Sequence, residues 1–171
     1  MTNIRRHYVP NTAIFITSVC YKRHPILKPR WCKELLLEVL REVKDNRPYQ
    51  MLAYVILDDH FHLLIKPDQK QSFSKIIQSV KQRFSHRYKK RIDAEVNGIW
   101  QPRFWDHVIR DDNDLMHHLD YIHFNPAKHG FVSCAGEYQW SSFSEHCKKG
   151  RYPPDWGVNE TPKYLESMNL E

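Results

Sequence analysis

The sequence contains no apolar run long enough to cross a membrane, because charged side chains interrupt every hydrophobic stretch within a few residues. The arginines near the N-terminus are not followed by the apolar segment of a secretory signal. The four cysteines lie far apart, and no two of them form a Cys-x-x-Cys pair. We therefore expect free thiols in a cytoplasmic protein without a membrane partner, and neither a disulfide framework nor a cysteine-bound zinc site.

Internal repeats and low-complexity segments are also absent from the sequence. The chain has 171 residues, of which 41% are hydrophobic and 13% aromatic. This composition suits one domain with a hydrophobic core and argues against disorder. A formal net charge of +6 permits a polyanionic partner but does not require one. Whether the protein has such a partner must be judged from how the charges are distributed along the chain.

Hydrophobic periodicity predicts alternating strands and helices. β-Branched and aromatic residues mark the strands, and apolar residues at helical spacing mark the helices. We expect Ser72 to cap one helix and Pro126 to end another at Asn125. The expected strands are 13–20, 49–57 and 60–66, with a fourth within 100–109, and the expected helices are about 28–46, 73–91 and 111–125.

This order of elements predicts the fold class. The second and third strands are close enough to form a hairpin around Asp58-Asp59, and helices connect the other strands. Such an order favours an α+β fold, a ferredoxin-like (RRM-like) sandwich in which an antiparallel sheet has helices on one face. We expect a single domain over residues 1–149 and a loosely ordered C-terminal tail over residues 150–171.

His60 and His62 flank Phe61 in the predicted third strand. Residues i and i+2 of a strand point to the same face, so the imidazoles would lie side by side while Phe61 enters the core. Two neighbouring imidazoles are half of a divalent metal site. Because two histidines at a strand end can also be purely structural, this pair alone does not define a site.

Tyr121 and Asn125 are four residues apart in the last predicted helix. That spacing puts both side chains on one side of the helix, beside the apolar face that Leu115, Leu119 and Ile122 form. A tyrosine that packs and an asparagine that precedes a proline would give the same local pattern, so this pair is also ambiguous by itself.

Together the two pairs suggest a chemistry. Tyrosine, with a pKa of about 10, is a poor nucleophile at neutral pH, but it can attack a phosphodiester that a metal polarises. Two histidines and one amide oxygen would supply three ligands and leave positions open for phosphate oxygens and water. This donor set suits Mg²⁺ or Mn²⁺, and imidazole shifts the preference towards Mn²⁺.

Several segments resemble the HUH single-strand transposases that use one catalytic tyrosine. Residues 54–65 resemble the His-hydrophobic-His motif of that superfamily. Residues 5–10, 100–110, 121–130 and 140–143 resemble one IS200-like branch of it, the REP-associated tyrosine transposases. The matches stay in order over about residues 5–143, which is most of the chain.

The resemblance implies that Tyr121 is the nucleophile, that His60 and His62 bind the metal, and that Asn125 takes the third ligand position. Many relatives have glutamine there, and asparagine keeps the amide oxygen on a shorter side chain. The implied reaction cleaves single-stranded DNA through a 5′-phosphotyrosine intermediate and releases a 3′ hydroxyl. The implied partners are hairpins of repetitive extragenic palindromic DNA in the bacterial nucleoid and, in some relatives, a second copy of the chain.

One departure from the family pattern lies beside the histidines. Relatives more often have Pro-Asn where this chain has Asp58-Asp59. The change adds negative charge near the proposed metal without removing a ligand. Either carboxylate could bind the metal through water, or the site could be tuned in another way.

Basic and aromatic residues are candidates for DNA contacts. Phosphate contact would make binding depend on salt, although a solvated helix face also explains a basic run. Phe104, Trp105 and Trp140 could stack on unpaired bases or simply pack in the core, and one of the histidines around Tyr121 could donate a proton to the leaving oxygen. The candidate phosphate contacts are Arg5, Arg6, Lys81, Arg83, Arg87, Lys90, Arg103 and Arg110.

Two other classes of protein fit parts of the pattern. A catalytically inactive, domesticated protein that binds hairpin DNA or RNA could share the fold, but the candidate nucleophile and ligands are all present. A zinc hydrolase would need a further strong ligand and a general base. The sequence has neither His-Glu-x-x-His nor a cysteine pair beside the histidines.

Overall fold

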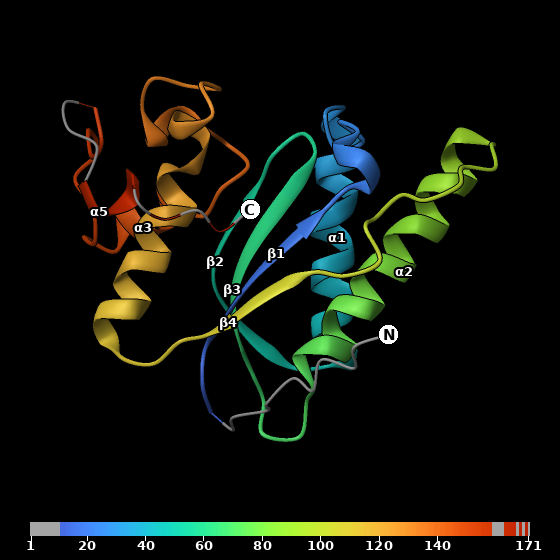
Figure 1. The fold of residues 1–171 in the computed structure, drawn as a ribbon, viewed down its shortest axis with the longest axis horizontal. Helices are drawn as coiled ribbons and strands as arrows, with labels where there is room; N and C mark the ends of the chain where they lie inside the picture. The colour runs from blue at the N-terminus through green and yellow to red at the C-terminus, as the bar shows by residue number, and fades with distance from the viewer. Residues whose placement is uncertain (1–10, 159–162, 167, 169, 171) are drawn as a thin grey trace.

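A computed structural model describes residues 11–158, 163–166, 168 and 170 of the chain. Its strands are β1 (Ile14–Val19), β2 (Tyr49–Ile56), β3 (His60–Pro67) and β4 (Trp105–Val108). Its helices are α1 (Arg30–Asn46), α2 (Phe73–Ile92), α3 (Asp112–Lys128), α4 (Phe143–Lys148) and α5 (Lys163–Glu166), with short 3-10 turns η1 (Tyr21–Arg23) and η2 (Ala135–Glu137). Figure 1 shows the sheet between α1 and α2 on one side and α3 on the other.

The strands form an antiparallel sheet in the order β2-β3-β1-β4. This order arises from two strand-helix-strand halves, β1-α1-β2 and β3-α2-β4, whose helices pack side by side on one face. The predicted ferredoxin-like α+β sandwich is therefore confirmed, with the β2–β3 hairpin where we expected it. The opposite face of the sheet is covered by α3, which follows the second half.

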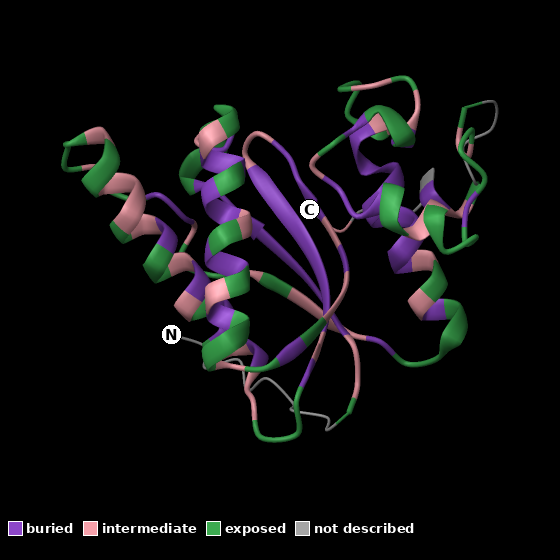
Figure 2. Ribbon diagram, turned by 180° about the vertical axis from the view of Figure 1, so that it is seen from behind, coloured by how far each residue is buried: buried purple, intermediate pink, exposed green. Residues whose placement is uncertain are grey.

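Alternation along β3 sends successive side chains to opposite faces of the sheet. Phe61 and Leu63 join the hydrophobic core beneath α1 and α2. Leu64 joins a second core beneath α3, and His60 and His62 point to that same face. Because both faces are covered, β1 and β3 are buried along almost their whole length, as the purple strands in Figure 2 show.

Two features fix which side of α3 faces the sheet: a cap at the start of the helix and the apolar residues along one of its faces. The side chain of Asp111 accepts a hydrogen bond from the backbone N–H of Asp114 and caps the helix. Leu119 and Ile122 then pack on the sheet. This packing turns Tyr121 towards β1 and β3.

Two predicted helix ends differ from the structure. Ser72 precedes α2 as expected, but its side chain makes no capping hydrogen bond. The prediction that Pro126 ends α3 at Asn125 is wrong, because the helix continues to Lys128. Pro126 lacks the N–H that would bond to the Ile122 carbonyl, but the last turn still closes through a hydrogen bond from the His129 N–H to the Asn125 carbonyl.

The segment after residue 149 contributes to the packed interior. Tyr152 and Leu165 are buried, in contact with the small core around α4 and the core beneath α3 respectively. The Tyr152 hydroxyl donates a hydrogen bond to Asp120 of α3 at 2.7 Å. The described part of the expected loose tail is therefore packed, and the domain boundary at 149 stays a prediction. No helix in the described part of the chain is both long and apolar enough to span a membrane.

Candidate active site

Two histidines from β3 meet on the sheet face that α3 covers. The ring centroids of His60 and His62 are 4.9 Å apart, and the side chains are almost completely buried. Phe61 between them enters the core on the opposite face. The structure therefore brings the two imidazoles together in the way that the two-residue period of a strand predicts.

The Nδ1 atom of each imidazole lies beside an oxygen acceptor. His60 Nδ1 is 2.5 Å from Asp59 Oδ1, and His62 Nδ1 is 2.8 Å from Thr17 Oγ1. The Thr17 hydroxyl donates its proton to the carbonyl of Leu170 at 2.8 Å, so it accepts a hydrogen bond from His62. A carboxylate also only accepts. Both rings therefore carry a proton on Nδ1, and Nε2 is the ring nitrogen that can serve as a ligand.

The two acidic residues of the β2–β3 turn have different partners. Asp58 Oδ1 is 2.5 Å from the Nζ of Lys33, whereas Asp59 accepts hydrogen bonds from His60 and from Arg23. Burial raises the pKa of Asp59, but these hydrogen bonds outweigh it and hold the pKa below its usual value. Asp59 thus supports His60 as carboxylates commonly support metal-binding histidines.

Helix α3 brings Tyr121 against the histidines. Its ring stands edge-on to the ring of His62, with centroids 5.4 Å apart and 72° between the planes. The side chain of Asn125 follows one turn later and is fully buried. The Nζ of Lys128 lies 4.9 Å from the centre of the Tyr121 ring. Tyr121 is only 1% exposed, so it lies within the apolar face of α3, whereas we expected it beside that face.

The donor set fits a divalent cation. The Nε2 of His60 is buried and has no hydrogen-bond partner among the residues that the structure describes, which is costly for a polar atom unless a ligand satisfies it. His62 presents the equivalent nitrogen, and the buried amide oxygen of Asn125 comes from the neighbouring helix. Imidazole nitrogens and an amide oxygen suit Mn²⁺ well and Mg²⁺ less well.

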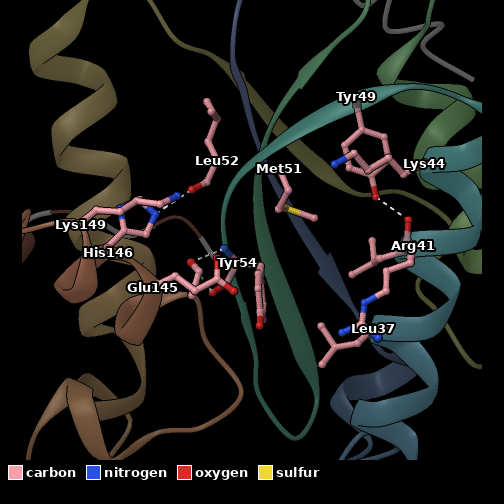
Figure 3. Close-up of a pocket in the computed structure, with 12 residues that line it drawn as sticks. Leu37, Arg41, Lys44, Tyr49, Met51, Leu52, Tyr54, Glu145, His146 and Lys149 are labelled. Atoms are coloured by element: carbon pink, nitrogen blue, oxygen red, sulfur yellow. Dashed lines mark hydrogen bonds between the residues drawn. The ribbon is translucent and has the colours of Figure 1, made fainter.

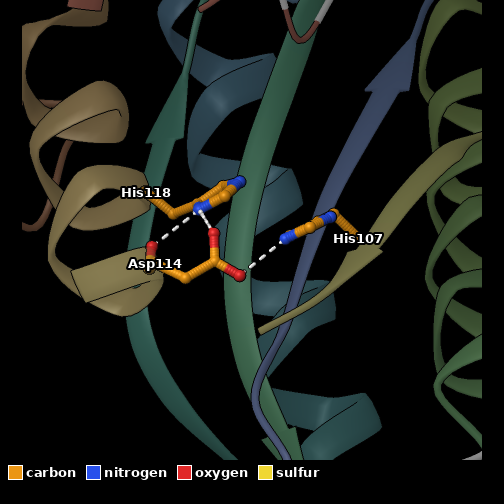
Figure 4. A group of neighbouring side chains, drawn as sticks. All are labelled: His107, Asp114 and His118. Atoms are coloured by element: carbon orange, nitrogen blue, oxygen red, sulfur yellow. Dashed lines mark hydrogen bonds and ion pairs between the residues drawn. The ribbon is translucent and has the colours of Figure 1, made fainter. Parts of the chain in front are cut away.

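A second polar cluster joins β4 to the start of α3. His107 Nε2 is 2.8 Å from Asp114 Oδ2, and His118 Nδ1 is 2.8 Å from the Asp114 carbonyl oxygen and 3.2 Å from Oδ1 (Figure 4). Burial raises the pKa of Asp114, but hydrogen bonds from His107 and Arg110 outweigh it and lower the pKa to about 2. The ligand atoms lie within 4.8 Å of one another, close enough to share a metal, but both carboxylate oxygens are already engaged.

The basic residues of α2 lie on the other side of the sheet from the histidine pair, because α2 packs on the opposite face (Figure 1). Arg87 donates hydrogen bonds to Glu38 and Glu42 of α1 at 2.7 and 2.6 Å, and Arg83 lies 3.6 Å from Glu42. Lys81 donates to a backbone carbonyl of the segment before β4 at 2.6 Å. These cations therefore have structural partners in addition to any role in binding.

The remaining candidate cations are more exposed. Lys90 lies at the solvent side of α2, and Arg103 is exposed just before β4. Arg110 follows β4 with a side chain that is 75% exposed, although its Nε lies 3.2 Å from a carboxylate four residues later. Arg103 and Arg110 thus bracket the edge strand β4. Arg5 and Arg6 lie outside the residues that the structure describes.

A groove of about 350 Å³ opens beside β2, between α1 and α4 (Figure 3). Its lining includes apolar side chains, three cations (Arg41, Lys44 and Lys149) and one acidic residue, Glu145. Burial lowers the pKa of His146, which also lines the groove. Neither His60 nor His62 lines this groove. This basic group cannot be recognised in the sequence because its members come from distant segments.

The residues that support the site are only partly visible in the sequence. Asp59 was expected near the proposed metal as a candidate ligand through water, whereas it contacts His60 Nδ1 instead, as a carboxylate partner of a metal-binding histidine commonly does. Thr17 could not be predicted, because its contact with His62 depends on the register between β1 and β3. Lys128 meets Tyr121 only because α3 continues past the proline.

Comparison with known proteins defines the class of this fold and site. The family described as "Transposase IS200 like" matches residues 8–123, which include the histidine pair and Tyr121. The chain belongs to the IS200-like transposase family. Two curated relatives then place it among the REP-associated tyrosine transposases within that family, and the resemblance found in the sequence is confirmed.

These relatives match almost the full length of the chain. A REP-associated tyrosine transposase of Escherichia coli is 33% identical over 163 residues, which are 94% of each protein. A putative REP-associated tyrosine transposase of Haemophilus influenzae is 35% identical over 168 residues, 93% of this chain and 95% of the relative.

Solved structures agree with this assignment. The structure described as that of "the REP associates tyrosine transposase bound to a REP hairpin" has a TM-score of 0.81 at 33% identity, over 94% of this chain and 95% of that one. A putative transposase from Deinococcus radiodurans has a TM-score of 0.52 at 15% identity, over 67% of this chain and 92% of that one. The second likeness concerns the fold alone.

Proposed function

We propose that this protein is a metal-dependent endonuclease and strand transferase that acts on single-stranded DNA through Tyr121. One observation carries the proposal: the Tyr121 ring stands 5.4 Å from the ring of His62, beside a second imidazole whose Nε2 is buried without a partner among the described residues. Contact between a tyrosine and a cation site suits phosphodiester transesterification, because the phenol is a weak nucleophile without such help.

In this proposal His60, His62 and Asn125 would hold Mg²⁺ or Mn²⁺. The bound cation would polarise the scissile phosphate and offset the charge that develops on it. Thr17 and Asp59 keep the imidazoles in the Nδ1–H tautomer, so that each Nε2 is available as a ligand. The positive charge of Lys128, 4.9 Å from the centre of the Tyr121 ring, would help to offset charge that develops on the scissile phosphate.

The proposed reaction exchanges one phosphodiester for another. The Tyr121 oxygen attacks the phosphorus and forms a bond to the 5′ phosphate, while the bond to the 3′ oxygen breaks and a 3′ hydroxyl leaves. Attack by the 3′ hydroxyl of a second strand reverses these steps and joins that strand to the 5′ phosphate. Cleavage and strand transfer thus need no external energy source.

The proposed substrate is a hairpin formed by repetitive extragenic palindromic DNA, in the cytoplasm at the bacterial nucleoid. Support comes from the solved relative, which is 33% identical and is described with a REP hairpin. Exposed Lys90, Arg103 and Arg110 are the first candidates for phosphate contacts. Lys81, Arg83, Arg87, Arg5 and Arg6 are further candidates, and assembly into a homodimer is part of the same proposal.

The alternative is a protein that binds hairpin DNA or RNA without cleaving it. The burial of Tyr121, which is 1% exposed, favours this alternative, because a phosphodiester cannot reach the phenol in this conformation. Cleavage requires that Tyr121 becomes accessible when DNA binds.

The test uses labelled hairpin DNA with single-stranded flanks, incubated with the protein and Mn²⁺, Mg²⁺ or a chelator. The proposal predicts a shorter labelled strand on a denaturing gel only with a divalent metal and only when Tyr121 is present. If hairpins of varied sequence bind but are never cut with either metal, the binding protein is the correct description. Cleavage that persists in Tyr121→Phe would exclude Tyr121 as the nucleophile.

A further inference from the structure

A column of stacked rings leads from the interior to the surface at β4. The ring of His107 stacks on that of His118, with centroids 4.7 Å apart and 11° between the planes. The ring of Trp105 stacks on His107 at 6.0 Å and 6°. His118 is 4% exposed, whereas Trp105 is 42% exposed. The indole is therefore the solvent-exposed end of a column whose inner end is buried.

The column is held in place by polar and aromatic contacts. Asp114 accepts a hydrogen bond from His107 and, through its backbone carbonyl, another from His118 (Figure 4). Phe15 braces the column with its ring 5.6 Å from that of Trp105 and 4.9 Å from that of His118. An exposed indole held in a fixed orientation loses little freedom when another flat ring stacks on it.

Trp105 and His62 lie on a line that crosses the sheet perpendicular to the strands, with Thr17 between them. The Cα partner of Trp105 is Thr17, and Thr17 is in turn the partner of His62. Side chains of directly paired residues share a face, so all three point towards the side that α3 covers. At about 4.8 Å between strands, the Cα atoms of Trp105 and His62 are roughly 10 Å apart. A base close to a phosphate at the histidines can span this distance.

We propose that Trp105 is a stacking platform for one unpaired base of the strand that is cleaved, next to the scissile phosphate. This inference rests on the proposed function and adds a contact that positions the strand. Every base has an aromatic face, so the platform would accept any of them. The same arrangement gives His107, Asp114 and His118 a role as supports for the indole. Exposed Arg103, two residues before Trp105, is placed to meet the adjoining phosphate.

The experiment measures binding in the Tyr121→Phe protein, so that cleavage does not interfere. A hairpin with single-stranded flanks carries one abasic site, which is moved along the flanks. We expect one abasic position to weaken binding roughly tenfold to a hundredfold. The same loss should follow from Trp105→Ala with intact DNA, and Trp105→Phe should retain most of the affinity. In Trp105→Ala the abasic site should cause no further loss.

The matched control is Trp31→Ala, because Trp31 lies on α1, on the other face of the sheet, where it stacks on Tyr88. That variant should keep the full abasic effect. The proposal is overturned if the abasic effect persists in Trp105→Ala while thermal unfolding shows a folded protein, or if that variant binds intact DNA normally. Cleavage by proteins that retain Tyr121 is measured separately. Without cleavage the catalytic proposal fails, while an abasic effect that depends on Trp105 still supports the platform.

Discussion

Thr17 and His62 are partners across β1 and β3, and the Thr17 hydroxyl accepts a hydrogen bond from His62 Nδ1 at 2.8 Å. This contact makes the chemistry of the site depend on strand register. A slip of one residue would turn one of the two side chains into the opposite core. In the observed register Thr17 holds Nδ1 of His62, so that Nε2 points away from Thr17 and can serve as a metal ligand.

Removing that hydroxyl should weaken metal binding. Thr17→Val keeps the side-chain shape but leaves His62 Nδ1 without its acceptor, so the ring tautomer and orientation are no longer held. We expect the affinity for Mn²⁺, measured by isothermal titration calorimetry, to fall about 10- to 100-fold. Thr17→Ser keeps an oxygen and should stay close to the unmutated protein. Equal affinities in the two variants would contradict this account of the contact.

The neighbouring carboxylates Asp58 and Asp59 should respond differently to the same change. Asp59→Asn removes the charge that supports His60, so we expect the Mn²⁺ affinity to fall about 10- to 100-fold. Asp58→Asn weakens the ion pair with Lys33, which should lower the free energy of unfolding by about 1–3 kcal/mol, since Lys33 is buried. Its Mn²⁺ affinity should be unchanged. A large loss of affinity in Asp58→Asn would mean that Asp58 also serves the metal.

Buried His123 should make the protein sensitive to acid. Burial, with smaller contributions from His146 and Arg151, lowers its pKa from 6.5 to about 3. Between these values the unfolded chain binds a proton that the folded protein does not. The free energy of unfolding should therefore fall below pH 6.5, by up to about 1.4 kcal/mol per pH unit.

His123→Gln removes that proton site and can keep a hydrogen bond to Ser142, whose hydroxyl lies 2.8 Å from His123 Nε2. Urea unfolding at pH 7.0, 5.5 and 4.5 should give a shallower loss of stability in this variant than in the unmutated protein. The same slope in both proteins would show that His123 is not the group responsible.

The salt dependence of DNA binding should distinguish the cations that contact phosphate from those that have a structural role. Arg103 is exposed beside β4, so Arg103→Ala should lower the salt slope for single-stranded DNA by about 0.7. Arg87 is shared between Glu38 and Glu42. We expect Arg87→Ala to change that slope less and to lower the free energy of unfolding by about 1 kcal/mol. A larger change of slope in Arg87→Ala would place the DNA along α2.

The local features of the fold and of the candidate site could be predicted from the sequence. The two-residue period of β3 predicts that His60 and His62 share a face, and the order of strands and helices predicts the sandwich. Helical spacing brings Tyr121 and Asn125 to one side of α3. Each of these inferences depends on residues that are close in the sequence, where backbone geometry alone relates the side chains.

The relations between distant segments could not be predicted. Thr17 meets His62 through a strand register that no local pattern specifies, and Trp105 reaches the same line across the sheet through a second pairing. His107 stacks on His118 only because the tertiary structure packs α3 beside β4. The extent of α3 was missed because a proline usually ends a helix at the preceding residue, whereas α3 continues beyond Pro126 to Lys128.

The central claim is that the Tyr121 oxygen forms a covalent bond to DNA. The most direct measurement is peptide mass spectrometry of the protein after incubation with hairpin DNA and Mn²⁺, followed by nuclease digestion. The account predicts a nucleotide attached through its 5′ phosphate to the peptide that contains Tyr121, and no such adduct in Tyr121→Phe or with chelator. An adduct on another residue, or cleavage without any adduct, would contradict it.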